Sequence, residues 1–157
     1  MKTLILTGAT GFTGRFLVEE ALKRNYKVIA LVRKSSNLNF LNNRNIDIIT
    51  ADLSNKESLT QGLKKLKNKI GPPDLIIHNA GLTKALRQKD YMANNEGTTR
   101  NLISALKESA LIPKKFIYTS SLAALGPGNA TTLTPITENT PPKPITFYGK
   151  SKLQAET

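Results

Sequence analysis

Short apolar runs alternate with longer amphipathic stretches along the whole chain. The runs occupy residues 2–7, 26–32, 46–50, 74–78 and 116–118. Apolar, β-branched runs of this length, bounded by turn residues, are typical of buried strands. The stretches between them carry apolar residues at helical spacing, as at Leu102, Leu106 and Ala110 within residues 89–110. This alternation predicts an α/β fold, in which a doubly wound parallel sheet lies between two helical layers (three-layer α/β/α).

Local signals predict where some of these elements begin and end. Ser54 and Glu57 have the spacing of a capping box, so a lysine-rich helix is predicted to begin there. Gly71-Pro72-Pro73 ends that helix. Residues 122–144 contain prolines at positions 127, 135, 141, 142 and 144, which are too many for long regular structure. We expect a surface loop there, and a loop of this length is more often functional than a simple connector.

The first apolar run breaks at a glycine-rich turn, and a helix is predicted over residues 15–23. A strand, a glycine turn and a helix in this order are typical of dinucleotide binding. Gly8 permits the tight turn, Gly11 lets the backbone approach a pyrophosphate, and Gly14 lets the helix pack closely on the strand. The helix N-terminus then presents unpaired N–H groups to the phosphates. We expect cofactor contacts from Gly8, Thr10, Gly11, Phe12, Thr13 and Gly14, and the alternative is a glycine turn without a ligand.

The residues after the second run bear on the choice of cofactor. A carboxylate at this strand end would bind the adenosine ribose hydroxyls of NAD, whereas an arginine accommodates the extra phosphate of NADP. Here Val32 is followed by Arg33 and Lys34 and then by two serines, so cations and hydroxyls stand where the carboxylate would be. The sequence favours NADP over NAD, with Arg33 as the contact. The alternative is an exposed basic loop.

Two further strand ends supply candidate contacts. Asp52 is placed to accept a hydrogen bond from an adenine amino group, with Leu53 against the ring. Asn79, Ala80 and Gly81 follow the fourth run and are small enough to let a cofactor lie against the backbone. His78 precedes them, and without a neighbouring carboxylate it is predicted to be a hydrogen-bonded structural histidine rather than a catalytic base.

Tyr148 and Lys152 are four residues apart on a predicted helix near the C-terminus. Residues at this spacing share a helix face, so a phenol and an ammonium can act on one substrate. An ordinary tyrosine is too weak an acid to serve as an efficient base at neutral pH, but a neighbouring ammonium favours the phenolate. The pair is therefore a candidate for proton transfer.

Composition excludes several classes of protein. The chain has no cysteine and one histidine, which argues against disulfides, thiol nucleophiles and a metal site. No apolar run approaches the roughly 20 residues of a membrane span, and the N-terminal run leads into a glycine turn rather than a signal-peptide cleavage site, so we expect a cytoplasmic protein with no membrane partner. The net charge of +12 raises the question of nucleic acid. Outside one lysine-rich helix, however, the basic residues are scattered and lack interleaved aromatics, which favours a solvated surface.

Six motifs occur in one order along the whole chain. They are residues 7–14, Ala51-Asp52-Leu53, His78-Asn79-Ala80-Gly81, Asn94-Asn95-Glu96-Gly97-Thr98, Tyr118-Thr119-Ser120-Ser121 and Tyr148-Gly149-Lys150-Ser151-Lys152. Together they resemble the extended branch of the short-chain dehydrogenase/reductase superfamily, the NAD(P)-dependent epimerase/dehydratase family. The resemblance implies a Rossmann sheet and a nicotinamide dinucleotide as cofactor.

The resemblance also implies roles for the motif residues near the C-terminus. Tyr148 corresponds to the family's general acid/base and Lys152 to its partner. Both are also expected to contact the cofactor, Lys152 at the nicotinamide ribose. Ser121 corresponds to the serine that hydrogen-bonds the reacting oxygen, with Ser120 as the alternative if the register shifts by one. The family also implies a homodimer through the helix after Lys89 and the helix bearing Tyr148.

Departures from the family pattern narrow the reaction. Family dehydratases carry an Asp-Glu pair where this chain has Leu122 and Ala123, so dehydration is disfavoured. Many epimerases carry a tyrosine where Leu125 precedes Gly126, which tilts the prediction toward a reductase or dehydrogenase. Extended members continue into a C-terminal substrate-binding portion. We therefore expect residues 1–157 to be one NAD(P)-binding domain without that portion, and to be inactive alone.

The sequence leaves more than one function open. The first is an NAD(P)-dependent oxidoreductase or epimerase that moves a hydride between the cofactor and a hydroxyl or ketone substrate, with nucleotide sugars among the candidates. The alternative is a non-catalytic dinucleotide-binding or scaffolding module. Nucleic-acid binding through the +12 charge is a distant third.

Overall fold

The computed structural model describes residues 1–42, 44–129 and 131–157. These residues form two compact units, which are described separately. The first comprises Met1–Ala80 and Thr99–Thr119, and the second comprises Gly81–Thr98 and Ser120–Thr157.

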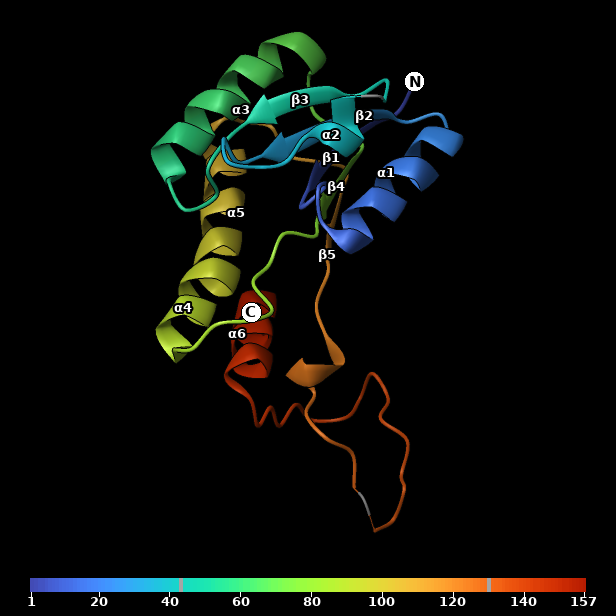
Figure 1. Cartoon of the computed structure of the whole chain (residues 1–157), viewed down its shortest axis with the longest axis vertical. Coiled ribbons are helices and arrows are strands. Elements are labelled where there is room, and N and C mark those ends of the chain that lie inside the picture. The colour runs from blue at the N-terminus through green and yellow to red at the C-terminus, as the bar shows by residue number, and fades with distance from the viewer. Residues whose placement is uncertain (43, 130) are drawn as a thin grey trace. The chain divides into compact units, whose positions relative to one another are not determined.

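The first unit is built on a parallel sheet (Figure 1). Its strands are β1 (Thr3–Thr7), β2 (Lys27–Val32), β3 (Asp47–Thr50), β4 (Leu75–His78) and β5 (Lys115–Tyr118). Their order is β3-β2-β1-β4-β5, and every neighbouring pair is parallel. The five predicted strands are therefore confirmed to within a residue or two at their ends. The chain builds outward from β1 to β3 and then continues on the other side with β4, which creates a topological switch point between β1 and β4.

Helices cover both faces of this sheet, as the sequence predicted. They are α1 (Phe12–Lys23), α2 (Asn39–Asn42), α3 (Lys56–Ile70) and α5 (Thr98–Glu108). Because side chains alternate along a strand, Ile5 packs with Leu63 of α3 and Leu102 of α5, whereas its neighbours Leu4 and Leu6 pack with Val18 of α1. The two cores lie on opposite faces of the sheet, which gives the three α/β/α layers.

Two helix starts differ from the sequence prediction. Helix α3 begins at Lys56, and its N-cap is Asn55, whose side-chain oxygen accepts from the Ser58 N–H at 2.9 Å. The predicted capping box at Ser54 is wrong, because the Ser54 hydroxyl instead donates to Asp52 at 2.7 Å. Helix α1 begins at Phe12 rather than Arg15, since Gly11 already serves as its N-cap.

The second unit contains shorter elements. They are α4 (Gln88–Met92), a π-helical turn (Ala93–Gly97), a 3₁₀ turn (Leu122–Ala124) and α6 (Phe147–Glu156). The helix predicted over residues 89–110 is therefore α-helical at both ends and π-helical at 93–97. The predicted loop over 122–144 is irregular after its opening 3₁₀ turn, apart from position 130, which lies outside the described residues. None of the helices in the described part of the chain is long and apolar enough to cross a membrane.

Two helical glycines of the first unit give a matched test of this packing. A Cβ at Gly14 would lie 2.0 Å from the Gly8 carbonyl oxygen, whereas a Cβ at Gly62 would meet only the Ile49 methyl at 4.0 Å. Gly14→Ala should therefore lower the free energy of unfolding by about 3 kcal/mol. Gly62→Ala should raise it by about 0.5–1 kcal/mol, because alanine favours a helix interior. Urea unfolding followed by circular dichroism measures both, and equal stability of the two variants would contradict the close contact.

Candidate functional site

The glycine turn lies at the carboxyl end of β1 and packs against the end of β4. Gly8 has a φ of +71°, and a Cβ there would lie 2.8 Å from the Ala80 nitrogen. The Asn79 side-chain amide donates to the Gly8 carbonyl oxygen at 3.5 Å. The first unit thus brings two predicted cofactor segments, the glycine turn and Asn79-Ala80, into contact.

The N-terminus of α1 fits an anionic ligand. Gly11 is its N-cap in an extended conformation, and no side chain of the described residues caps the first turn. The N–H groups of Phe12 and Thr13 therefore stand at a helix end whose partial positive charge favours phosphate oxygens. Gly11 is exposed, and a Cβ there would meet only the Gly8 oxygen at 3.4 Å, so a ligand can approach the backbone.

Arg33 and Asp52 come together at the carboxyl ends of β2 and β3. The Arg33 N–H donates to the Ser36 hydroxyl at 3.1 Å, in a turn that also joins the Ser36 N–H to the Arg33 carbonyl at 2.9 Å. Hydrogen bonds from the side chain and backbone of Ser54 hold the pKa of Asp52 below its ordinary value, and the charge of Arg33 lowers it further. Leu53 is half-buried, and its carbonyl accepts from Asn101 of α5 at 2.9 Å.

His78 is the structural histidine that the sequence predicted. Its ring is fully buried, with Nδ1 2.7 Å from the Thr7 hydroxyl and Nε2 3.0 Å from the Thr99 hydroxyl. The Thr7 hydroxyl oxygen also accepts from the Ala80 N–H at 3.0 Å. Both ring nitrogens are thus engaged within the core, and the chain of bonds fixes the turn after β4.

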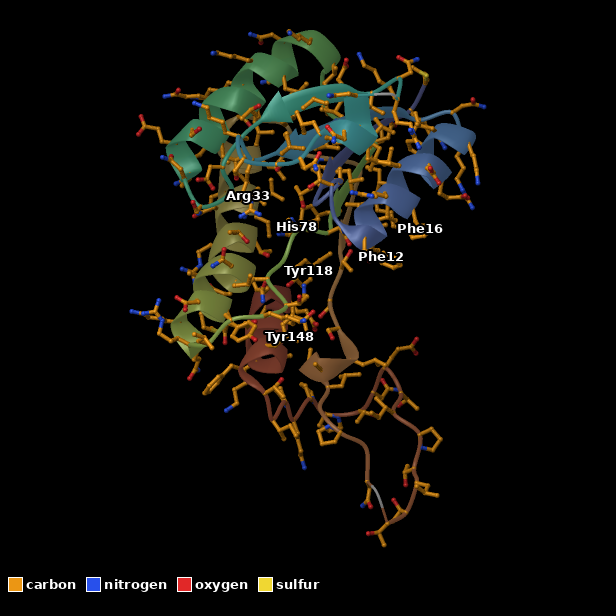
Figure 2. All side chains as sticks on the ribbon, viewed as in Figure 1. Phe12, Phe16, Arg33, His78, Tyr118 and Tyr148 are labelled. Carbon is orange, nitrogen blue, oxygen red and sulfur yellow. The ribbon has the colours of Figure 1, made fainter. Side chains whose placement is uncertain are left out.

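The predicted cofactor residues of the first unit therefore follow one edge of the sheet. Figure 2 labels Arg33, which follows β2, His78, which ends β4, and Phe12, which follows Gly11 of the glycine turn. This edge is where open α/β sheets bind ligands. Gly81, the last residue of the predicted set, belongs to the second unit.

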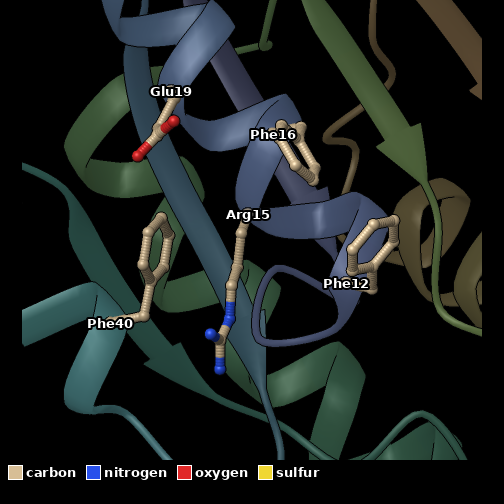
Figure 3. A pocket seen from close by; sticks show the side chains of 5 residues that line it. All are labelled: Phe12, Arg15, Phe16, Glu19 and Phe40. Carbon is tan, nitrogen blue, oxygen red and sulfur yellow. The ribbon is translucent and has the colours of Figure 1, made fainter.

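An aromatic hollow of about 310 Å³ lies beside the glycine turn, on the outer side of α1 (Figure 3). Phe12 is 82% exposed and forms an edge-to-face pair with Phe16, with ring centroids 5.3 Å apart. Phe40 lies under the guanidinium of Arg15 at 5.3 Å and that of Arg44 at 4.2 Å. Of these residues the sequence singled out only Phe12, because the others come from exposed helix positions and a short segment without a motif.

In the second unit, α6 packs directly on the 3₁₀ turn that follows Ser121. A Cβ at Gly149 would lie 2.1 Å from the Ala123 carbonyl oxygen, so only glycine allows this approach. Thr146 caps the helix by accepting from the Gly149 N–H at 2.9 Å. This contact of Gly149 with Ala123 ties the helix that carries Tyr148 to the turn that follows Ser121, within the second unit.

The two candidate serines make different hydrogen bonds. Ser120 donates to the carboxylate of Glu156, the last residue of α6. Ser121 is the N-cap of the 3₁₀ turn, and its hydroxyl oxygen accepts from the Ala123 N–H at 3.2 Å. The Ser121 hydroxyl hydrogen is not used in that bond, whereas the hydroxyl hydrogen of Ser120 is directed to Glu156.

Lys152 is buried, with 3% of its surface exposed. Its ammonium lies 3.6 Å from the position that a Cβ on Gly81 would take, so the glycine leaves room for it. Burial lowers the pKa of Lys152 to about 8, and the carboxylate of Glu156 acts in the opposite direction. Lys152 is thus a desolvated cation that still carries its proton in most molecules at neutral pH.

Asn95 holds the segments around Lys152 together, and sequence reasoning assigned it no role. Its side chain accepts from the Leu82 N–H at 2.7 Å, donates to the Leu82 carbonyl at 3.1 Å and donates to the Ser151 hydroxyl at 2.8 Å. Asn95 is 1% exposed and lies in the π-helical turn, a distortion that is frequent at functional sites. Its motif was visible in the sequence, but the bonding partners come from segments distant along the chain.

The Tyr148 ring borders a hollow of about 560 Å³ within the second unit. Its other lining residues are Ala85, Tyr91, Ala123, Ile145, Thr146 and Phe147. The rings of Tyr91 and Tyr148 lie 6.1 Å apart at 55°. The volume suits a small organic ligand.

Comparison with known proteins points to one family. A model of the NAD-dependent epimerase/dehydratase family matches residues 4–157. A sterol-4-alpha-carboxylate 3-dehydrogenase (decarboxylating) from Dictyostelium discoideum is 28% identical and is aligned over 99% of this chain and 47% of its own length. UDP-glucose 4-epimerase 2 from Oryza sativa subsp. japonica is 29% identical, over 99% of this chain and 39% of its own.

Solved structures give the same picture. The UDP-Glc/GlcNAc 4-epimerase of Campylobacter jejuni is similar with a TM-score of 0.81 and 26% identity, and the match covers 99% of this chain and 47% of that one. The chain therefore spans about half the length of the relatives it matches, or less.

The buried Lys152 predicts a pH dependence of stability. Its pKa is about 8 in the folded chain and 10.5 in the unfolded one, so the unfolded chain holds the proton more tightly. The destabilisation caused by burying the charge is fully present below pH 8 and is lost as the pH rises from 8 to 10.5. Between pH 7.5 and 9.5, the free energy of unfolding of the wild type should therefore rise relative to that of Lys152→Met.

Urea titrations at several pH values measure this difference. Lys150→Met removes an exposed ammonium from the same helix and is the matched control. A flat profile for Lys152→Met would contradict the desolvation of Lys152.

Proposed function

The chain belongs to the NAD-dependent epimerase/dehydratase family, and we propose that it forms the cofactor-binding part of an oxidoreductase. This enzyme moves a hydride between a nicotinamide dinucleotide and a hydroxyl or ketone substrate. One observation carries the proposal: Ser121, Tyr148 and Lys152 all belong to the second unit. Within it Gly149 packs so closely on the 3₁₀ turn that a Cβ there would lie 2.1 Å from the Ala123 carbonyl oxygen.

Tyr148 is the proposed acid/base. In the oxidation of a secondary alcohol, the phenolate of Tyr148 takes the hydroxyl proton while the carbon–oxygen double bond forms. A nicotinamide dinucleotide, when bound, would supply the acceptor for the hydride that leaves the carbinol carbon. In the reverse direction Tyr148 returns its proton to the new hydroxyl oxygen, so the two directions balance.

Lys152 and Ser121 support that proton transfer. Lys152, four residues from Tyr148 on α6, brings a buried ammonium to the same helix. Burial strengthens its effect, because charges interact more strongly away from water. The Ser121 hydroxyl can donate to the substrate oxygen while its own oxygen caps the 3₁₀ turn. Ser120 is less suited to this role, since its hydroxyl donates to Glu156.

The cofactor is proposed to lie along the sheet edge of the first unit. The glycine turn and the N-terminus of α1 would hold the pyrophosphate, and Asp52 with Leu53 the adenine. Asn79 and Ala80 are small residues after β4 that would let the cofactor lie against the backbone. Arg33 at the end of β2 makes NADP the preferred form, because its guanidinium suits the extra phosphate.

Family membership leaves the substrate class open. The names of the relatives include both a sterol carboxylate and a nucleotide sugar. Both would use the same alcohol–ketone redox step, so the residues around Tyr148 bear on the choice between them. Because the chain spans about half the length of these relatives, activity is best tested on the full-length gene product.

Tyr148→Phe tests the catalytic proposal. It removes the proton-carrying hydroxyl and keeps the ring, so we expect kcat/KM to fall about 10²- to 10⁴-fold while NADPH binding is retained. Turnover is followed by NADPH absorbance and affinity by calorimetry. Tyr26→Phe, at a position outside the proposed site, should behave as wild type. Full activity of Tyr148→Phe, or failure of the folded protein to bind either dinucleotide, would overturn the proposal.

Arg33→Asp tests the cofactor preference. The carboxylate would repel the NADP phosphate and accept hydrogen bonds from the ribose hydroxyls of NAD, so the ratio of the two dissociation constants should reverse in favour of NAD. Lys69→Asp makes the same charge change on α3 and should leave the ratio as it is. An unaltered ratio in Arg33→Asp would show that Arg33 does not choose the cofactor.

A further inference from the structure

The hollow beside Tyr148 has an apolar wall. Ala85, Ala123, Ile145 and Phe147 contribute methyl groups and a ring, and Tyr91 contributes a second ring. Ile145 is 73% exposed and Phe147 is 47% exposed. Large apolar side chains left open on the wall of a pocket are typical of a ligand-binding surface.

Most polar groups of this wall are already bonded to backbone. The Tyr91 hydroxyl accepts from the Ala85 N–H at 3.0 Å and lies 3.5 Å from the Thr83 carbonyl. The Thr146 hydroxyl oxygen accepts from the Gly149 N–H in the cap of α6. Among the residues that the structure describes, no charged side chain lines the hollow.

The remaining polar group is the Tyr148 hydroxyl, which the proposed reaction uses. A substrate in the hollow therefore meets the Tyr148 hydroxyl, the hydroxyls of Tyr91 and Thr146 that already bond to backbone, and an otherwise mainly apolar wall. A sugar ring placed there would lose water from several hydroxyls and meet few hydrogen-bonding side chains on this wall, and hydroxyls left unpaired weaken binding. An apolar ring loses nothing comparable and gains contact area.

We propose that the substrate presents its reacting hydroxyl or ketone on an apolar ring system, and that this ring fills the hollow lined by Ile145 and Phe147. This inference rests on the proposed function. Ile145 and Phe147 then act as specificity residues on either side of Thr146. The redox step is unchanged: the alcohol loses its proton to Tyr148 and its hydride to NADP, giving a ketone.

The experiment compares two probes on the full-length gene product with NADP. One is 4-phenylcyclohexanol, an apolar secondary alcohol, followed by NADPH formation. The other is UDP-glucose, followed by NADPH formation and by chromatography of the nucleotide sugar. We expect kcat/KM for 4-phenylcyclohexanol to exceed that for UDP-glucose, and that for unsubstituted cyclohexanol, by about 10-fold or more.

A matched pair of variants locates the contact. Ile145→Asn places an amide in the hollow and should lower kcat/KM for 4-phenylcyclohexanol about 10-fold, mainly through KM, with NADPH affinity unchanged. Ile112→Asn makes the same change at a position that is 52% exposed and belongs to the first unit, and should have no effect. Equal kinetics of Ile145→Asn and wild type would overturn the placement of the ring.

The outcomes separate this inference from the proposed function. Preferred turnover of UDP-glucose that is lost in Tyr148→Phe would overturn the apolar substrate and leave the oxidoreductase standing. Turnover of neither probe by protein that binds NADPH would also overturn the substrate class. Failure to bind NADPH and NADH would overturn the proposed function itself.

Discussion

Both units depend on backbone approaching backbone more closely than any Cβ allows. Gly14 brings α1 against the Gly8 carbonyl, where a Cβ would lie 2.0 Å from the oxygen, and Gly149 does the same for α6 at the Ala123 carbonyl, at 2.1 Å. A helix fixed through its backbone cannot shift to relieve a clash, because the surrounding interior is close-packed. The amides at the start of α1, and Tyr148 and Lys152 on α6, are therefore held in place within their own units, and a site needs supporting contacts of this kind to keep its geometry.

Buried polar side chains fix the segments that these helices meet. Thr7, His78 and Thr99 form a continuous hydrogen-bonded chain in the core of the first unit, and it ends at the Ala80 N–H. Asn95 plays the corresponding part in the second unit, where it bonds both backbone groups of Leu82 and the Ser151 hydroxyl. A buried polar group left without a partner costs about 1–3 kcal/mol, so each network favours a single arrangement of its segments. Polar residues without a direct chemical role thus determine where the candidate site residues stand.

The sheet could be predicted from the sequence because each strand is a local apolar run between turn residues. Apolar residues in the middle of these runs, such as Ile29 and Ile76, are buried. The glycine turn and the Tyr148–Lys152 pair were also readable, since their chemistry depends on residues close together in the chain. The π-helical turn at 93–97 was not, because an amphipathic pattern does not reveal one extra residue in a turn. The choice of Asn55 over Ser54 as a cap depends on the bond that Ser54 makes to Asp52. The hollow beside Tyr148 joins Ala85, Tyr91 and Ile145, which are too distant in sequence to form a motif.

Water exclusion links the apolar hollow to the buried lysine. Lys152 lies one helical turn from Tyr148, and the loss of its hydration lowers its pKa to about 8. The same loss strengthens its interaction with any negative charge that forms on a nearby phenol, because the field is less screened away from water. An apolar ring in the hollow would remove more water from the Tyr148 side of this pair. A substrate that binds through carbon contacts would thereby strengthen the electrostatic support for its own deprotonation, whereas a heavily hydrated substrate would bring the screening water with it.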